Sequence, residues 1–144
     1  MSLEENKELV RRSWAAYDSG DEETFRALLT DDWVEWDGAG NSVTLDEVLE
    51  SMRLQRESFP DKHTEIDIMV AEGDLVVARS TTRATHQGPY LDLEPTGGEV
   101  VVYEISIHRI ADGKIAETWE QSGPAGFYEQ LTGSKAPAQA DNMS

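Results

Sequence analysis

Polar side chains that could do acid-base chemistry lie on two segments rich in β-branched residues, at residues 100–110 and 114–122. Side chains two positions apart share one face of a strand. A carboxylate buried in an apolar cavity has a raised pKa, so it could take a proton from a carbon next to a carbonyl and return it to the developing oxyanion. The polar residues that share a face in this way are Glu104, Ser106 and His108 in the first segment, and Thr118 and Glu120 in the second.

Alternation alone does not show which face of a strand is inside. The opposite face of residues 100–110 carries an apolar row made of Val101, Tyr103, Ile105 and Ile107. Because apolar side chains gain free energy from burial, this pattern taken alone favours a buried apolar row, with Glu104 and His108 in water. Acid-base chemistry inside the protein requires the reverse orientation.

Aromatic side chains and one further histidine are candidates for a ligand-binding surface. Trp14 and Tyr17 fall on the apolar face of a helix expected over residues 4–19, and Trp36 ends a short strand. Such residues usually belong to the core, but an aromatic wall would also suit a flat ligand. His86 closes a strand, where it either lines the mouth of a pocket or is a hydrogen-bonded or exposed strand-end residue.

The sequence offers no motif for a metal or an organic cofactor. It has no cysteine, and its 3 histidines lack the tight spacing of metal ligands. It also has no glycine-rich phosphate loop and no Gly-x-Ser-x-Gly nucleophile elbow. We therefore predict no metal site and no cofactor, and neither nucleotide-dependent nor serine-hydrolase chemistry.

The composition indicates one domain. A chain of 144 residues is long enough for one sizeable core and too short for two. With 29 acidic and 12 basic residues, a formal net charge of -17 and no Lys or Arg cluster, nucleic acid and anionic membranes are poor partners. The N-terminus lacks a signal-peptide pattern, and no apolar run approaches the roughly 20 residues of a membrane span. We expect a soluble, cytoplasmic protein.

Helices are expected first and strands afterwards. Capping and breaking signals predict helices over residues 4–19, from Asp21 to residues 31–32, and from the capping box of Thr44 and Glu47 to Phe59. Strands are expected at residues 33–36, 65–70, 75–86, 100–110 and 114–122, followed by a helical turn through residues 127–131. This order predicts an α+β fold with helices on one face of an antiparallel sheet. The domain would cover residues 1–133, and residues 134–144 would form a disordered tail.

Six short motifs follow one another along the chain: FPDKH at residues 59–63, AEGDLVVAR at 71–79, THQG at 85–88, PTG at 95–97, IHRIADGKIAETW at 107–119 and QLTG at 130–133. Together they resemble the SnoaL-like polyketide cyclases of the NTF2-like superfamily. The resemblance implies a cone-shaped barrel, in which a curved antiparallel sheet and about three N-terminal helices enclose a pocket for a small apolar ligand. It also implies a homodimer.

The resemblance implies roles for particular residues. The carboxylate that follows the tryptophan of the last strand is the general acid/base of these cyclases, and here it corresponds to Glu120, where Asp is usual. Their pocket histidine on the preceding strand corresponds to Ser106, and a histidine found in many relatives corresponds to Thr118. By the same analogy, the face with Glu104, Ser106 and His108 points into the cavity.

Three functions remain open at this point. The first is a cofactor-independent enzyme that uses Glu120 for aldol-type cyclisation or isomerisation of an apolar carbonyl or ester substrate. The second is a protein that binds a small ligand without chemistry, since Ser106 replaces the pocket histidine. The third is dehydration or epoxide hydrolysis, with a water molecule positioned by Glu104 and His108. Whether the protein is an enzyme is therefore left undecided by the sequence.

Overall fold

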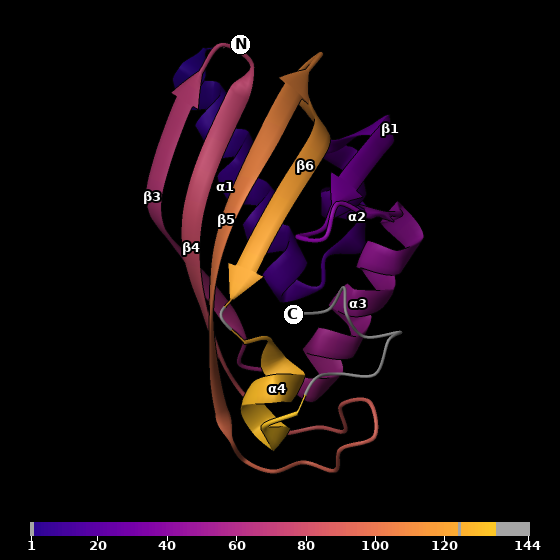
Figure 1. The fold of residues 1–144 in the computed structure, drawn as a ribbon. Helices are drawn as coiled ribbons and strands as arrows, with labels where there is room; N and C mark the ends of the chain where they lie inside the picture. Colours follow the sequence, from indigo (N-terminus) through magenta and orange to yellow (C-terminus); the bar gives the residue numbers. More distant parts are fainter. Residues whose placement is uncertain (1, 124, 135–144) are drawn as a thin grey trace.

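The computed structural model describes residues 2–123 and 125–134, so the predicted tail lies outside the described residues except for Ser134. The chain forms helices and strands in the order α1 (Leu3–Ser19), α2 (Glu22–Ala27), β1 (Leu29–Trp36), β2 (Ser42–Val43), α3 (Leu45–Ser58), β3 (His63–Glu72), β4 (Leu75–Thr85), β5 (Glu99–Ala111), β6 (Lys114–Gly123) and α4 (Phe127–Thr132). Figure 1 shows the long strands as a curved sheet with the helices against it. Within the described residues, no helix is long and apolar enough to span a membrane.

The sheet has six strands in the order β2-β1-β6-β5-β4-β3, and its two ends do not meet. The α+β class and the curved sheet of the NTF2-like fold are thus confirmed, as an open sheet rather than a closed barrel. One pairing differs from the antiparallel prediction, because β1 runs parallel to β6 and brings Glu35 beside Thr118. This parallel pair joins the N-terminal part of the chain to the long strands.

Local signals set the beginning of the chain as predicted, up to the start of α2. Ser2 and Glu5 form a capping box at the start of α1, and Gly20, with φ 75°, ends the helix in the left-handed conformation. The second helix was predicted to continue to residues 31–32, which is wrong. It ends at Ala27, and β1 begins at Leu29, which pairs with Ile115 of β6. Sheet pairing here overrides the helical periodicity.

The third helix has the predicted limits. Thr44 and Glu47 form the capping box of α3, and the helix ends at Ser58 with Phe59 as its C-cap, before Pro60. The two-residue strand β2 that precedes α3 was not predicted. It pairs with the C-terminal end of β1, with Glu35 opposite Val43, and so holds that end of β1 in place.

The strand β5 turns its polar row inward. Glu104, Ser106 and His108 are buried, whereas Tyr103 is 43% exposed and Ile105 is 53% exposed. The expectation from the pattern alone, that the apolar row is buried, is wrong, and the orientation implied by the family resemblance is correct. The inner face is polar because it borders a cavity lined by Glu104, His108 and Glu120.

A bulge at the hairpin of β5 and β6 changes which residues of β6 face inward. The turn is tight, with φ 53° at Asp112 and 73° at Gly113, as expected for an Asp-Gly hairpin. The pairing shifts by one residue between Arg109 and Ile110. Because of this shift, Ile115 is buried in the core together with the inward-facing Thr118 three residues later.

A second, smaller core closes the other end of the molecule. The ring of Phe59 lies 5.1 Å from that of Tyr90 and 4.7 Å from that of Phe127, which belongs to α4. The loop that holds Tyr90 is fixed at Gly88, whose backbone N–H donates to the Ser58 carbonyl. A Cβ at Gly88 would lie 2.2 Å from the Glu57 carbonyl oxygen, so only glycine fits there.

Candidate active site

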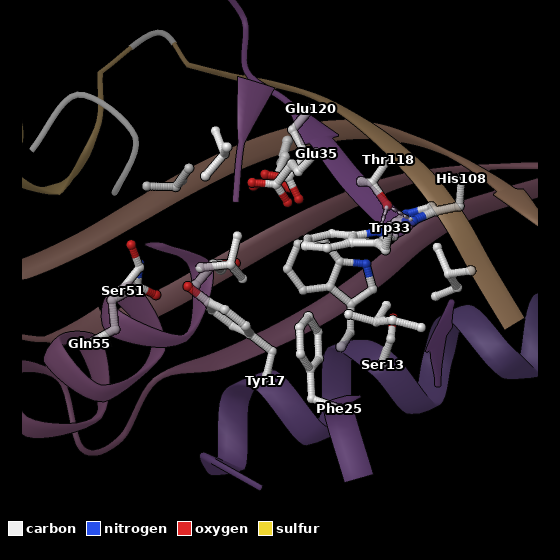
Figure 2. A pocket seen from close by; sticks show the side chains of 18 of the residues that line it. Ser13, Tyr17, Phe25, Trp33, Glu35, Ser51, Gln55, His108, Thr118 and Glu120 are labelled. Atoms are coloured by element: carbon white, nitrogen blue, oxygen red, sulfur yellow. Dashed lines mark hydrogen bonds between the residues drawn. The ribbon is translucent and has the colours of Figure 1, made fainter. Parts of the chain in front are cut away.

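A cavity of about 810 Å³, including the open space at its mouth, lies between the helices and the inner face of the sheet. Aromatic side chains of α1, α2 and β1 line one side of it. The ring centroids of Trp14 and Tyr17 are 6.4 Å apart, those of Tyr17 and Phe25 are 5.8 Å apart, and those of Phe25 and Trp33 are 6.2 Å apart. Figure 2 shows Tyr17 and Phe25 on the helix side, with Glu35 and Glu120 across the cavity. The lining suits an apolar ligand with flat surfaces.

Three glutamates from three neighbouring strands meet on the sheet side of this cavity. Glu120 lies on β6, one inward position beyond Thr118, which pairs with Glu35 of β1. On the other side, Ser106 of β5 pairs with Glu120, and Glu104 lies one inward position away along β5. Glu35 and Glu104 therefore flank Glu120, and each forms a side-chain hydrogen bond with it. We call these three residues the glutamate triad.

The triad holds protons that three isolated glutamates would lose. A carboxylate has only acceptor atoms, so a hydrogen bond between two carboxyl groups contains a proton. Burial, and then the charge of Glu120, raise the pKa of Glu35 and of Glu104 well above the ordinary value. Burial also raises the pKa of Glu120, but the hydrogen bonds from Glu104 and Glu35 and the charge of Lys62 oppose this. Glu120 is therefore the first of the three to ionise.

A buried ion pair lies beside the triad at the cavity wall. The ammonium of Lys62 contacts the carboxylate of Asp18 and lies 4.7 Å from the centre of the Tyr17 ring. The second oxygen of Asp18 accepts a hydrogen bond of 2.7 Å from the Thr64 backbone N–H. The Lys62 side chain is only 5% exposed, so its charge acts on Glu104 and Glu120 with little screening by water.

His108 is held in a chain of hydrogen bonds deeper in the cavity. The indole N–H of Trp33 donates to the Thr118 hydroxyl at 3.2 Å, and that hydroxyl is 3.2 Å from Nδ1 of His108. The other ring nitrogen, Nε2, is 2.9 Å from the Ser106 hydroxyl. Each hydroxyl can donate or accept, so both ring nitrogens are hydrogen-bonded in either neutral tautomer. Burial lowers the pKa of His108 to about 4. The ring is therefore neutral and engaged at both nitrogens near neutral pH.

The structure brings most of the predicted site residues together, but not all of them. The cavity lining includes Trp14, Tyr17, Glu104, His108, Thr118 and Glu120. Ser106 points inward and is fully buried beneath the lining, where it contacts His108.

Two residues predicted to bind a ligand lie elsewhere. Trp36 is next to the inward-facing Glu35, so its side chain is on the outer face of β1, where its indole N–H donates to Glu117 at 2.7 Å. His86 is fully buried in the second core, with its ring 5.6 Å from that of Phe59 and its Nδ1 accepting from the Thr96 backbone N–H. Strand alternation places Trp36 outside the cavity. The fold of the loop after β4 places His86 in the second core.

Two charged members of the site, Glu35 and Lys62, were not predicted. Glu35 shares strand alternation with Trp33, and this was the signal that could have placed it inward. Lys62 lies between Asp61 and the exposed His63 and looks like an ordinary surface residue in the sequence. Its burial depends on Asp18, 44 positions earlier in the chain.

The triad is not arranged as a metal site. Over residues 2–123 and 125–134, no group of three or more histidine, aspartate or glutamate side chains is placed to hold a metal ion. The chemistry that the arrangement offers by itself is proton transfer, from an ionisable carboxyl group flanked by two neutral carboxylic acids.

Comparison with known proteins finds relatives of the same fold. The sequence model of the SnoaL-like polyketide cyclases matches residues 7–131. AclR from Streptomyces galilaeus is 28% identical with a TM-score of 0.84, over 95% of this chain and 87% of its own. IdmH from Streptomyces antibioticus is 27% identical with a TM-score of 0.76, over 88% and 97% of the two chains. TsrD from Streptomyces laurentii is 26% identical with a TM-score of 0.76, over 92% and 98%. Among curated proteins, none matches.

Proposed function

Because the chain belongs to the SnoaL-like polyketide cyclase family, we propose that it is a cofactor-independent cyclase or isomerase in which Glu120 is the general base. The observation that carries this proposal is the position of the Glu120 carboxyl group. It faces an aromatic cavity, and the hydrogen bonds from Glu104 and Glu35 favour its ionised form. A base of raised pKa in an apolar site is well suited to removing a proton from carbon near neutral pH.

The proposed reaction is an aldol-type ring closure on an apolar carbonyl or ester substrate. Glu120 removes a proton from the carbon next to a carbonyl, and the C–H electrons form an enolate. The enolate carbon then attacks a second carbonyl of the same molecule, which forms the new C–C bond and an alkoxide. The proton held by Glu120 goes to that alkoxide, so the base is restored and no cofactor is consumed. An isomerisation would use the same first step and return the proton to another carbon.

The test is proton exchange at carbon, which requires only the first step. We would follow the uptake of solvent deuterium next to the carbonyl of α-tetralone, a neutral bicyclic aromatic ketone, by NMR. Glu120→Gln should slow this exchange by about 10² or more and leave the fold intact by circular dichroism. Glu117→Gln is the matched control, because Glu117 lies on the same strand and pairs with Arg109 on the opposite face. Exchange by the Glu120 variant at the rate of the unmodified protein would contradict the proposal.

The geometry gives less support to chemistry with a positioned water molecule. That function required Glu104 and His108 to hold the water together. Both ring nitrogens of His108 are already engaged, with Ser106 and Thr118, so neither is left to orient a water for attack. Opening of an epoxide with solvent oxygen is therefore the less favoured function of this cavity.

We propose in addition that two copies of the protein assemble through the outer face of the sheet. Support comes from the large apolar side chains that this face exposes, which include Ile68, Val70, Tyr103, Ile105 and Ile107. Contiguous apolar surface of this kind is typical of protein interfaces. A cytoplasmic location stays a prediction from the sequence.

A further inference from the structure

Glu104 is a buried acid without a conventional partner. It is 9% exposed, and its Oε1 atom accepts no hydrogen bond from the described part of the chain. The hydrogen bond that its carboxyl group does form is with another acid, Glu120. While Glu120 carries the negative charge, an ionised Glu104 would receive no proton from it and would lie beside a like charge, at a cost of several kcal/mol. Glu104 is therefore present as a neutral carboxylic acid, with its proton on the hydrogen bond to Glu120.

Glu35, on the other side of Glu120, is also a neutral carboxylic acid. It lies on the inner face of β1 and also hydrogen-bonds to Glu120. Two donors and one acceptor account for both hydrogen bonds, so the triad holds two protons and one negative charge. If Glu120 acted only as a base, a neutral ketone would become an enolate anion. A second group must give a proton to the enolate oxygen if the substrate is to stay neutral.

We propose that Glu104 is the general acid of this site, which gives its proton to the carbonyl oxygen of the substrate as Glu120 takes the proton from carbon. This inference rests on the proposed function of Glu120. At Glu120 the substrate C–H bond breaks and an O–H bond forms. At Glu104 the O–H bond breaks and the O–H bond of the enol forms. The substrate stays neutral, and the single negative charge of the triad moves from Glu120 to Glu104.

The second half of the reaction restores both groups. As the enol carbon attacks the second carbonyl, the enol O–H bond breaks and its proton returns to Glu104. The proton on Glu120 goes to the oxygen of the carbonyl under attack, which becomes a hydroxyl group. The charge is again on Glu120, and no proton is gained or lost overall. At no stage does the apolar cavity contain two negative charges, which would be costly at this distance.

Glu104, rather than Glu35, is suited to accept the charge, because their surroundings differ. The positive charge of Lys62 acts on Glu104 and favours its ionised form. Glu35 has the negative charge of Asp37 nearby instead, which disfavours ionisation. Glu35 therefore remains neutral throughout and acts as a positioning residue that holds Glu120 by its hydrogen bond.

The inference is tested by measuring protonation and exchange on the same variants. Infrared spectroscopy of the protein at neutral pH resolves the C=O stretch of neutral carboxylic acids from that of carboxylates. We expect this band in the unmodified protein and a smaller one in Glu104→Gln and in Glu35→Gln, with Glu117→Gln unchanged. A band of full size in Glu104→Gln would show that Glu104 is ionised and would overturn the inference.

Deuterium exchange of α-tetralone then separates the roles. Glu104→Gln keeps a hydrogen-bond donor but has no proton to give, so exchange should fall by about 10². Glu35→Gln should slow the exchange less than Glu104→Gln does, since the amide still donates to Glu120. Glu117→Gln, on the outer face, should leave the exchange unchanged. Loss of exchange in Glu120→Gln but not in Glu104→Gln would remove the acid role and leave the base in place. Exchange by the unmodified protein no faster than in buffer would contradict the proposed function and this inference together.

Discussion

The carboxyl groups of Glu104 on β5 and Glu120 on β6 are hydrogen-bonded to each other, although both belong to acidic residues. The contact exists because the two antiparallel strands place Ser106 opposite Glu120, and Glu104 one inward position away. A parallel strand on the far side of β6 adds Glu35. The register of three strands thus brings together three carboxyl groups that share two protons. Their protonation must affect the free energy of unfolding as well as the chemistry.

Glu35→Gln should make the protein more stable at neutral and alkaline pH. Burial raises the pKa of Glu35 in the folded state, so above the ordinary Glu pKa the folded protein holds a proton that the unfolded chain has lost. Stability of the unmodified protein therefore falls as pH rises through this range, by about 1.4 kcal/mol for each unit of pKa difference. The neutral amide has no such dependence. The free energy of unfolding in urea, measured at several pH values, gives the difference between the two proteins.

Glu117→Gln is the control for that measurement, because its carboxylate lies on the outer face and pairs with Arg109. The advantage of the Glu35→Gln variant should grow steadily from acid to alkaline pH. A constant difference between the Glu35→Gln variant and the unmodified protein at all pH values would show that Glu35 ionises normally in the folded state.

His108→Gln should reduce the loss of stability in acid. Burial lowers the pKa of His108 to about 4. At pH values between this pKa and the ordinary histidine pKa, the unfolded chain binds a proton at His108 and the folded state does not. The unmodified protein therefore loses about 3 kcal/mol as pH falls through this range. The variant lacks this contribution, although it loses some stability at all pH values because the hydrogen bonds to Ser106 and Thr118 are imperfectly replaced. Parallel acid profiles for the two proteins would contradict the buried, neutral state of His108.

Asp18→Asn should destabilise the protein by about 3 kcal/mol, since removal of one partner leaves the charge of Lys62 buried and unpaired. The double variant with Lys62→Met should recover part of this loss. As a control, Arg53→Met breaks the surface pair of Arg53 and Glu22, in which the side chains are 60% and 32% exposed, and should cost less than about 1 kcal/mol. Equal effects of Asp18→Asn and Arg53→Met on urea unfolding would show that the Lys62 ion pair is solvated.

The helices were predictable from sequence wherever the deciding interactions are local. Capping boxes of residues three positions apart begin two helices, with Ser2 and Glu5 at the start of α1 and Thr44 and Glu47 at the start of α3. Gly20 ends α1 because it adopts the left-handed conformation. The extent of β1 was not predictable in this way. Leu29 is apolar and lies at helical spacing from Phe25, and only its pairing with a strand more than 80 positions later makes it part of the sheet.

The candidate site was predictable only in part, for a similar reason. Family motifs pointed to Glu120 and to the inward face of Glu104, whereas strand alternation by itself could not choose between the two faces of β5. Glu35 joins the triad through the parallel pairing of β1 with β6, for which the sequence has no local signal. The burial of Lys62 depends in the same way on a distant partner, Asp18.

Ile105→Glu should convert the proposed homodimer into a monomer. Ile105 is 53% exposed on the outer face of β5, beside Tyr103 and Ile107, and a carboxylate there would have to lose its water on association. Light scattering at micromolar concentration should give twice the chain mass for the unmodified protein and the single mass for the variant. Leu3→Glu is the control, because Leu3 is 45% exposed but lies at the start of α1, away from this face. A monomeric mass for the unmodified protein would mean that the apolar face is not a contact between two copies.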